Sequence, residues 1–463
     1  MGTLSRVWIT TLFAAAISIA PGAATNAEVA SLIARAAGAS EIVITDLGLL
    51  PGGTSSAGLA INGEPIIVGL ATDSSLNLQR PFWNANTGVI VGFADNFNPA
   101  STAIPEHVNA NREMAGTELY GDNVYQGIYW NPAGQAFVLR PLSGVDPDYG
   151  VLHTKAHGIN SQGQLAGAGK EGPPNFFTHA SLWPNKETNG IDLGFLGQGN
   201  PSYSEAYAVN DLSHVVGNST IGSPIHGFLW RNGQLTDLGA LSGQVASEAR
   251  AINNTGLIAG KSNVFPVVWE YDPANPGRAP RIRQLPIPAG FFSATPTAVN
   301  DSGDVVGYAG SPNIDSHAVL WRDGMAIDLG VWPGGHYSVA NGINNLGQIV
   351  GTGTVSGNNL DHALMWTVEE GGVGIPCEDL VSFQVRCKSS GGGNKLQARL
   401  TLTNTNHSGA SVTISLDGEP FTVPISGNQA KLSVKETTTG PHTIELTDPA
   451  GCFAPVVVGC PTE

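Results

Sequence analysis

Seven polar residues occupy two matching positions of a repeated segment and carry the groups that a binding or active site uses. The segment ends in Ile-Asn or Val-Asn, and the two positions lie three and five residues before the Asn. Carboxylates, imidazole and phenol can transfer protons, and Lys, Arg and Tyr can bind carboxylates or hydroxyls. The sequence therefore predicts a site built from residues in four consecutive copies of the segment: Glu106, Lys155, His157, Glu205, Tyr207, Glu248 and Arg250.

Three interpretations of this set stay open. The residues can be a solvated lining whose charges pair with one another, or they can bind a ligand such as a sugar hydroxyl or a uronate. In a catalytic interpretation, Tyr207 or His157 takes a proton while Arg250 neutralises a carboxylate, or Glu205 and Glu248 act as paired carboxylates. The sequence has no GxSxG, HExxH, P-loop or EF-hand motif, so it predicts no particular reaction.

The repeat predicts the scaffold. Each repeat Asn is followed seven residues later by Gly and then, after a variable loop, by a Trp that ends an apolar run. The period of 43–51 residues is typical of one four-stranded β-propeller blade. The composition, with 60 Gly, 30 Pro and 13% charged residues, also favours an all-β protein. The repeat Asn residues are Asn62, Asn109, Asn160, Asn210, Asn253, Asn300 and Asn344, and the Trp residues are Trp83, Trp130, Trp183, Trp230, Trp269, Trp321 and Trp366.

The segment before each repeat Asn is expected to form the innermost strand of its blade. Strand alternation then places the residues three and five before the Asn on one side of the strand, near the loop that enters from the previous blade. In a closed ring these residues converge on one mouth of the central channel, a preferred location for ligands. The positions two and four before the Asn are mostly Ala, Gly or Pro, as close packing between blades requires.

The two ends of the repeated region complement each other. The last unit lacks the "DLG" strand that follows the Trp in other units, whereas "IVITDLGLLPGG" at 42–53 has no third strand before it. We therefore expect a seven-bladed propeller closed by the N-terminal strand, which hides both sheet edges. A linear solenoid is the alternative.

The pattern "INxxGxxxG…HAxLW…DLGxLxG" over residues 42–366 resembles the HAF repeat of exported bacterial proteins, with a kelch-like blade layout. The resemblance implies export and a repeat architecture, and it implies no reaction. The residues at the His place are predicted to make a structural hydrogen bond in each blade, and neither a metal nor a cofactor is expected. Four units have His there, namely His179, His226, His317 and His362, and three have Gln79, Gln126 or Phe265.

The N-terminus predicts export. Arg6, the apolar run 7–20 and the small residues after it have the layout of a secretory signal, which we place at 1–27. We therefore expect a secreted, extracellular or cell-surface protein without membrane insertion. The net charge of −16, with no basic run, argues against nucleic acid or an anionic membrane as a partner. The expected partner is an extracellular glycan or protein ligand.

The remainder of the chain is predicted to form a second domain. The propeller is expected at 41–368, a Gly-rich linker at 369–375, and a small immunoglobulin-like β-sandwich at 376–463, where short strands alternate with turn residues. All four cysteines fall in this last domain, and their spacing does not suit zinc, so two disulfides are expected.

The disulfides are predicted to be nested. If the first and last strands of the sandwich run antiparallel, Cys377 pairs with Cys460 and Cys387 pairs with Cys452. Peptide mapping without reduction tests this pairing, and a Cys377–Cys387 peptide would contradict it.

Overall fold

The computed structural model describes residues 41–94, 101–120, 124–143, 153–170, 177–197, 203–222, 224–275, 277–312, 314–355, 360–369, 380–390, 393–402, 411–417, 419–426, 428–436, 440–448 and 456–460. The chain divides into two compact units, one of which is Ile42–Val368. The other unit contains the strands from Leu380 onward. The predicted signal sequence and residues 370–375 of the predicted linker lie outside the described residues.

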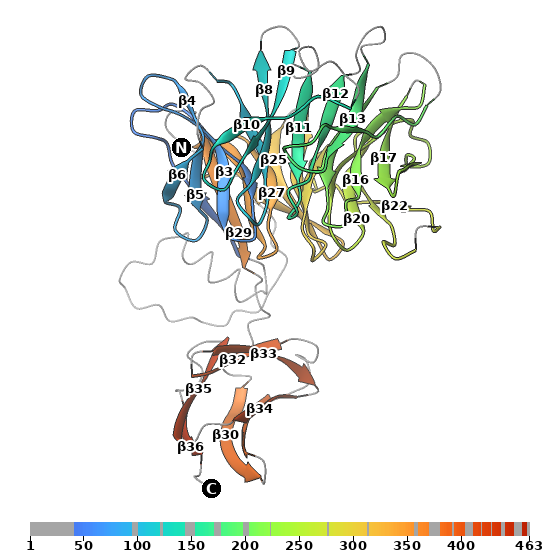
Figure 1. Ribbon diagram of the computed structural model, residues 1–463. Helices are drawn as coiled ribbons and strands as arrows, with labels where there is room; N and C mark the ends of the chain where they lie inside the picture. The colour runs from blue at the N-terminus through green and yellow to red at the C-terminus, as the bar shows by residue number, and fades with distance from the viewer. Residues whose placement is uncertain are drawn as a thin grey trace, which may run out of the picture. The chain divides into compact units, whose positions relative to one another are not determined.

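The larger unit consists of seven antiparallel sheets, which we call blades 1 to 7 (Figure 1). Each has a path of four strands, and blade 1 carries the additional short strand β4. This architecture confirms the prediction of an all-β propeller with four-stranded blades.

Blades 1 to 3 contain β2 (Ser56–Ile61), β3 (Ile66–Thr72), β4 (Leu78–Gln79), β5 (Pro81–Asn84) and β6 (Ile90–Phe93); β7 (Ile104–Val108), β8 (Met114–Tyr120), β9 (Val124–Trp130) and β10 (Ala136–Val138); and β11 (Thr154–Ile159), β12 (Leu165–Lys170), β13 (Thr178–Trp183) and β14 (Ile191–Asp192).

Blades 4 to 7 contain β15 (Ser204–Val209), β16 (Val215–Thr220), β17 (Ile225–Arg231) and β18 (Gln234–Asp237); β19 (Ser247–Ile252), β20 (Leu257–Ser262), β21 (Phe265–Glu270) and β22 (Arg281–Gln284); β23 (Ser293–Val299), β24 (Val305–Ser311), β25 (Ile314–Arg322) and β26 (Met325–Gly330); and β27 (Ser338–Ile343), β28 (Gln348–Val355), β29 (Leu360–Glu369) and β1 (Glu41–Asp46).

Strand β1, which precedes blade 1 in the chain, is the outer strand of blade 7. His362 Nδ1 lies 2.9 Å from the carboxylate of Asp46 on this strand. The Ser56 hydroxyl at the start of blade 1 accepts a hydrogen bond from Ala363 N of blade 7 and donates one to Gly48 O. These contacts join the first and last repeats of the chain.

The repeat Asn residues form a cycle of hydrogen bonds at the centre of the ring. Each Nδ2 donates to the backbone carbonyl of the repeat Asn in the next blade, and Asn344 Nδ2 donates to Asn62 O, where the cycle began. In each blade Oδ1 accepts from the backbone four residues further on, as in the bond from Leu257 N to Asn253 Oδ1. Every repeat Asn is buried. The side chain therefore shapes its own turn and also bonds to the next blade.

The apolar core lies between neighbouring blades. One cluster packs Ile66 and Val68 of blade 1 against Met114, Ile128 and Trp130 of blade 2. Another packs Val216 and Leu229 of blade 4 against Trp269 of blade 5. Five of the seven repeat Trp side chains are among the largest fully buried ones. Their burial between sheets explains why one Trp recurs in each unit.

The repeat glycines allow the two innermost strands of a blade to approach. A Cβ on Gly69 would lie 1.9 Å from Ala57 O, and one on Gly260 would lie 2.0 Å from Glu248 O. Any side chain would therefore force the first and second strands apart.

The C-terminal unit has strands in the order β30-β31-β34-β33-β32-β35-β36. Its core includes Leu396, Leu400, Ile414 and Ile444, with Cys387 packed against it. No free cysteine is found among the described residues. The side chains of the other three cysteines lie outside the described residues, so the nested pairing stays a prediction, as does the immunoglobulin-like class. The strands are β30 (Leu380–Ser390), β31 (Gly393–Leu402), β32 (Ser411–Leu416), β33 (Glu419–Ser426), β34 (Gln429–Glu436), β35 (Gly440–Asp448) and β36 (Val456–Cys460).

The Asn cycle predicts a specific loss of stability. Asn253→Ala removes the bond to the next blade and leaves buried backbone groups without a partner, so it should lower the free energy of unfolding by about 1–3 kcal/mol. Leu346→Ala, at an exposed position in the Asn344 turn, should change it by less than about 0.5 kcal/mol. Urea unfolding measures both, and equal effects would contradict the role assigned to the cycle.

Candidate functional site

The centre of the ring holds a cavity of about 590 Å³. It is lined by residues of every innermost strand, from three before the repeat Asn to one after it. Of the seven predicted site residues, Glu106, His157, Tyr207 and Arg250 line this cavity. The other three, Lys155, Glu205 and Glu248, are not part of its lining.

This placement differs from the expectation that the residues three before the repeat Asn and those five before it converge on one mouth of the central channel. In every blade the pairing of the first two strands shifts by one residue three positions before the Asn, which makes a β-bulge. The bulge interrupts strand alternation, so the residues three and two before the Asn both line the cavity. The cavity therefore extends toward the Asn turns, and the residues five before the Asn lie nearer the opposite end of each strand. The bulge residues are Leu59, Glu106, His157, Tyr207, Arg250, Thr297 and Asn341.

A first charge network joins blades 2, 3 and 4 through His157. Its Nδ1 lies 2.5 Å from Glu106 Oε2, and its Nε2 lies 2.8 Å from Glu205 Oε1. Lys155 Nζ donates to the same Glu205 oxygen at 2.8 Å, and the Tyr203 hydroxyl donates to the other oxygen. Glu205 is 6% exposed in its side chain, so this network replaces the water that a carboxylate normally binds.

The network fixes the protonation of its members. Burial of the His157 ring opposes the cation, but the two carboxylates, Glu106 foremost, outweigh it and raise the pKa of His157 to about 9. Burial likewise opposes the charge on Glu205, but His157 and Lys155 outweigh it and lower the pKa of Glu205 to about 2. At neutral pH His157 is therefore a cation with both ring nitrogens engaged, and it cannot accept a proton.

Tyr207 lies beside this network. Its ring centroid is 5.5 Å from that of His157, and its hydroxyl accepts a hydrogen bond from Asn218 Nδ2 at 3.0 Å. Burial and the charges of Glu205 and Glu248 raise the pKa of Tyr207 to about 12. Tyr207 therefore keeps its proton at neutral pH and can donate a hydrogen bond to a ligand.

A second charge network lies in blade 5. Arg250 Nη2 donates to Glu248 Oε2 at 2.9 Å, and Lys261 Nζ lies 3.3 Å from Glu248 Oε1. Arg250 Nε is buried and has no hydrogen-bond partner among the described residues. Glu248 is thus occupied by two cations, which does not suit the role of a catalytic carboxylate.

The remaining bulge residues form a neutral arc. The Thr297 hydroxyl donates to Ala340 O at 2.8 Å, and Asn341 Nδ2 donates to Gly58 O at 2.8 Å. Leu59 has no polar side chain. These residues bind neighbouring blades, so among the bulge residues the polar groups available to a ligand lie on the side of the cavity formed by blades 2 to 5. The Asn turns add polar residues around the ring, among them Asp211 and Asp301.

Sequence reasoning missed several residues of the site: His107, Asp211 and Asp301 in the cavity lining, and Asn218 and Lys261 in the charge networks behind it. His107 lines the cavity two residues before the repeat Asn, where the other six units have Ala or Gly. Desolvation by the channel wall lowers the pKa of His107. Its departure from the small-residue pattern was a usable signal. Asn218 and Lys261 come from second strands and face Glu205 and Glu248 across the sheet, a pairing that only the strand register reveals.

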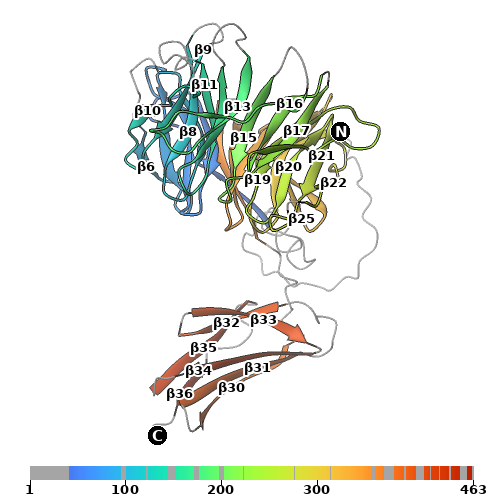
Figure 2. The same ribbon diagram turned by 45° about the vertical axis from the view of Figure 1, so that its right-hand side comes forward.

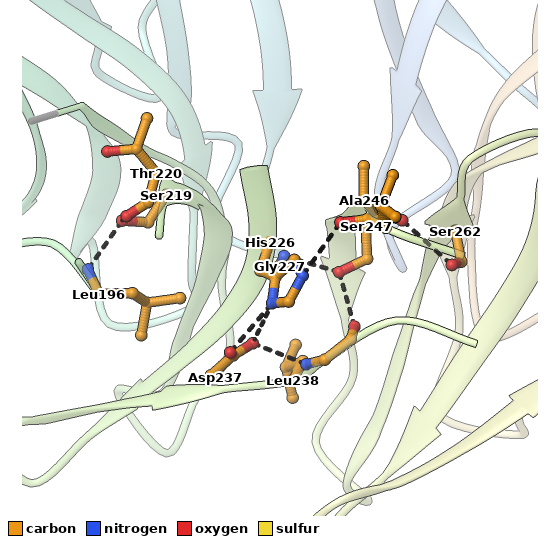
Figure 3. Close-up of polar contacts among 12 residues, drawn as sticks. Leu196, Ser219, Thr220, His226, Gly227, Asp237, Leu238, Ala246, Ser247 and Ser262 are labelled. Carbon is orange, nitrogen blue, oxygen red and sulfur yellow. Dashed lines mark hydrogen bonds and ion pairs between the residues drawn. The ribbon is translucent and has the colours of Figure 1, made fainter. Parts of the chain in front are cut away.

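The residues at the His place make structural contacts, as Figure 3 shows for blade 4. His226 Nδ1 lies 2.9 Å from Asp237 Oδ1, and the same pairing joins His179 to Asp192 and His317 to Asp328. Beside it, Gly227 N donates to the Ser247 hydroxyl of blade 5, which donates in turn to Gly239 O. Each such His therefore orients the strand that bonds to the next blade.

No group of three or more potential metal ligands is found among the described residues. Within the same part of the chain, no helix is long and apolar enough to span a bilayer.

No protein-family model matches the chain, and no curated protein sequence is significantly similar to it. The HAF-repeat resemblance therefore stays a prediction.

Similar solved structures include β-propeller proteins. A prolyl endopeptidase matches at 11% identity with a TM-score of 0.48, covering 77% of this chain and 56% of that one. The β-propeller domain of the Trilobed protease from Pyrococcus furiosus matches at 12% identity with a TM-score of 0.42, and the match covers 68% of this chain and 95% of that domain. AofleA from Arthrobotrys oligospora matches at 12% identity with a TM-score of 0.31, and the match covers 86% of this chain and 94% of that one. The chain spans little more than half of the endopeptidase and of the acylaminoacyl peptidase from Pyrococcus horikoshii. At these TM-scores the similarities identify no activity.

The His157 network predicts a pH dependence. Because the pKa of His157 is higher in the folded chain, about 9 against 6.5, its contribution to stability is complete below pH 6.5 and is lost as the pH rises to about 9. The free energy of unfolding of the wild type minus that of His157→Gln should fall over this interval by an amount on the order of 3 kcal/mol. Urea unfolding from pH 6 to pH 9.5 measures the difference. A constant difference would show that the folded state does not favour the His157 cation.

Proposed function

We propose that this chain is an exported β-propeller that binds an extracellular carbohydrate in its central cavity. The observation that supports this most directly is that the predicted acid and base groups are held by fixed partners. His157 is a paired cation, Glu205 has three donors, and Glu248 has two cations. Such a site is preorganised for binding, and none of these groups is free to transfer a proton.

The shape and polarity of the cavity suit a small part of a polymer. Its volume of about 590 Å³ lies in the range of about 300–1,000 Å³ that is usual for small-molecule sites. Tyr207, Arg250 and His107 supply polar groups from one arc, whereas Thr297 and Asn341 bond to the wall. A ligand with several hydroxyls would bind in one orientation against the polar arc.

Export and the second domain belong to the same proposal. The predicted signal at 1–27, the HAF-type repeat and a disulfide-bonded immunoglobulin-like domain at 376–463 all suit a secreted or surface-associated binding protein. A protein ligand is the alternative partner, and it would be expected to contact the outer face of the blades more than the cavity.

A polysaccharide lyase or glycoside hydrolase is the enzymatic alternative. It needs an unpaired base, or a carboxyl group that stays protonated, next to the ligand. Incubation with uronate polysaccharides tests for a lyase, because the unsaturated products absorb in the ultraviolet. Turnover by the wild type would contradict a purely binding role.

Binding is tested by retention of the mature chain on a panel of immobilised polysaccharides. For a retained polysaccharide, Tyr207→Phe should weaken binding about tenfold, because it removes only the hydroxyl of a residue that lines the cavity. Tyr308→Phe is the matched control, since Tyr308 lies on the second strand of blade 6 and is not part of the cavity lining. Retention on no polysaccharide, or equal loss in both variants, would overturn the proposed site.

A further inference from the structure

The two charge networks of the site differ in their net charge. The network of blades 2 to 4 is balanced, because Lys155 and protonated His157 face Glu106 and Glu205. The network of blade 5 is not balanced, because Arg250 and Lys261 share the single carboxylate of Glu248. This network therefore carries one excess positive charge, in a chain whose net charge is −16, and of its three members Arg250 lines the cavity.

Arg250 is the member of this network that reaches the cavity. Glu248 holds one end of its guanidinium group through Nη2, which fixes the plane of the group. The buried Nε has no partner among the described residues, and Arg250 lines the cavity whereas Glu248 and Lys261 do not. The Arg250 side chain as a whole is 37% exposed, so a ligand acceptor can reach the part of the guanidinium group that Glu248 does not occupy.

The neighbouring carboxylates of both networks are already engaged by donors. Glu106 lies against His157, and Glu205 is surrounded by His157, Lys155 and Tyr203. Glu248 is already shared between Arg250 and Lys261. Two further carboxylates, those of Asp211 and Asp301, line the cavity at the Asn turns, where they accept hydrogen bonds from Ser161, Asn254 and Asn345. Each lies directly after a repeat Asn, whereas Arg250 lies three residues before one, so an anion bound at the bulge residues meets the Arg250 guanidinium.

We propose that the cavity selects a carboxylated sugar, a hexuronate unit whose carboxylate binds Arg250 while a ring hydroxyl accepts a hydrogen bond from Tyr207. This inference rests on the proposed carbohydrate binding. A carboxylate is planar and matches the guanidinium fork, and its single charge equals the excess charge of the blade 5 network. A phosphate group carries about −1.5 to −2 charges at neutral pH and would exceed the excess charge of this network.

The test uses polysaccharides in matched pairs. Polygalacturonate, alginate and hyaluronan are each immobilised beside their carboxyl-reduced forms, which keep the sugar chain and lose the charge. Neutral glucans and galactans and a sulfated glucan complete the panel. The wild type should bind at least one uronate polymer at least tenfold more tightly than its reduced form, and this preference should decrease as salt concentration rises.

Two arginine variants assign the preference to its residue. Arg250→Gln should reduce the preference for the uronate form to less than threefold, and Arg250→Lys should restore it in part because the charge returns without the fork. Arg283→Gln is the matched control, since Arg283 is an exposed arginine on β22 of the same blade. Melting temperatures establish that each variant is folded. If Arg250→Gln is unstable, Lys261→Gln serves as the second variant, because it leaves Arg250 in place. It should weaken the preference less than Arg250→Gln and more than Arg283→Gln.

The outcomes separate the two proposals. Equal binding of uronate and reduced forms, or binding of neutral polymers alone, would overturn the selection of a carboxylate and leave carbohydrate binding intact. Tighter binding of the sulfated glucan than of every uronate would also overturn it. Retention of no polymer would overturn the proposed function itself and, with it, this inference.

Discussion

The cycle of seven hydrogen bonds between repeat Asn residues is the interaction on which the rest of the propeller depends. Each Asn fixes the turn after its innermost strand and ties that turn to the next blade. The bond from Asn344 to Asn62 joins repeats that lie at opposite ends of the chain's repeated region. With the turns fixed in this way, the bulge residues of all seven blades line one shared cavity. Figure 2 shows how successive blades lie side by side, as β15 of blade 4 and β19 of blade 5 do.

The bulge explains how a regular scaffold carries an irregular site. A bulge residue is left out of the ladder between the first two strands, so its side chain is not required for packing within the blade. That position therefore accepts Leu, Glu, His, Tyr, Arg, Thr and Asn in turn, while the Gly and Trp positions stay uniform. Two charge networks then arise on one arc because the bulge residues of blades 2, 3 and 5 are Glu106, His157 and Arg250.

The sequence predicted the blades well because their packing demands the same residue types in every unit. Trp366 without a following "DLG" strand and "IVITDLG" without a preceding strand indicated where β1 pairs. The site was predicted less completely. Alternation alone could not reveal the bulge, so Lys155, Glu205 and Glu248 were expected beside the cavity. Lys261 and Asn218 depend on cross-strand register, which has no signature in the sequence.

The central claim is that a ligand binds inside the ring, on the arc of blades 2 to 5. The most direct measurement is nuclear magnetic resonance of the labelled chain, titrated with an oligosaccharide from a polymer that it retains. We predict that the Arg250 Nε–H resonance and the side-chain signals of Tyr207 and His107 shift together with one dissociation constant. Shifts confined to the outer strands of the blades or to the C-terminal unit, with these three residues unchanged, would contradict the account.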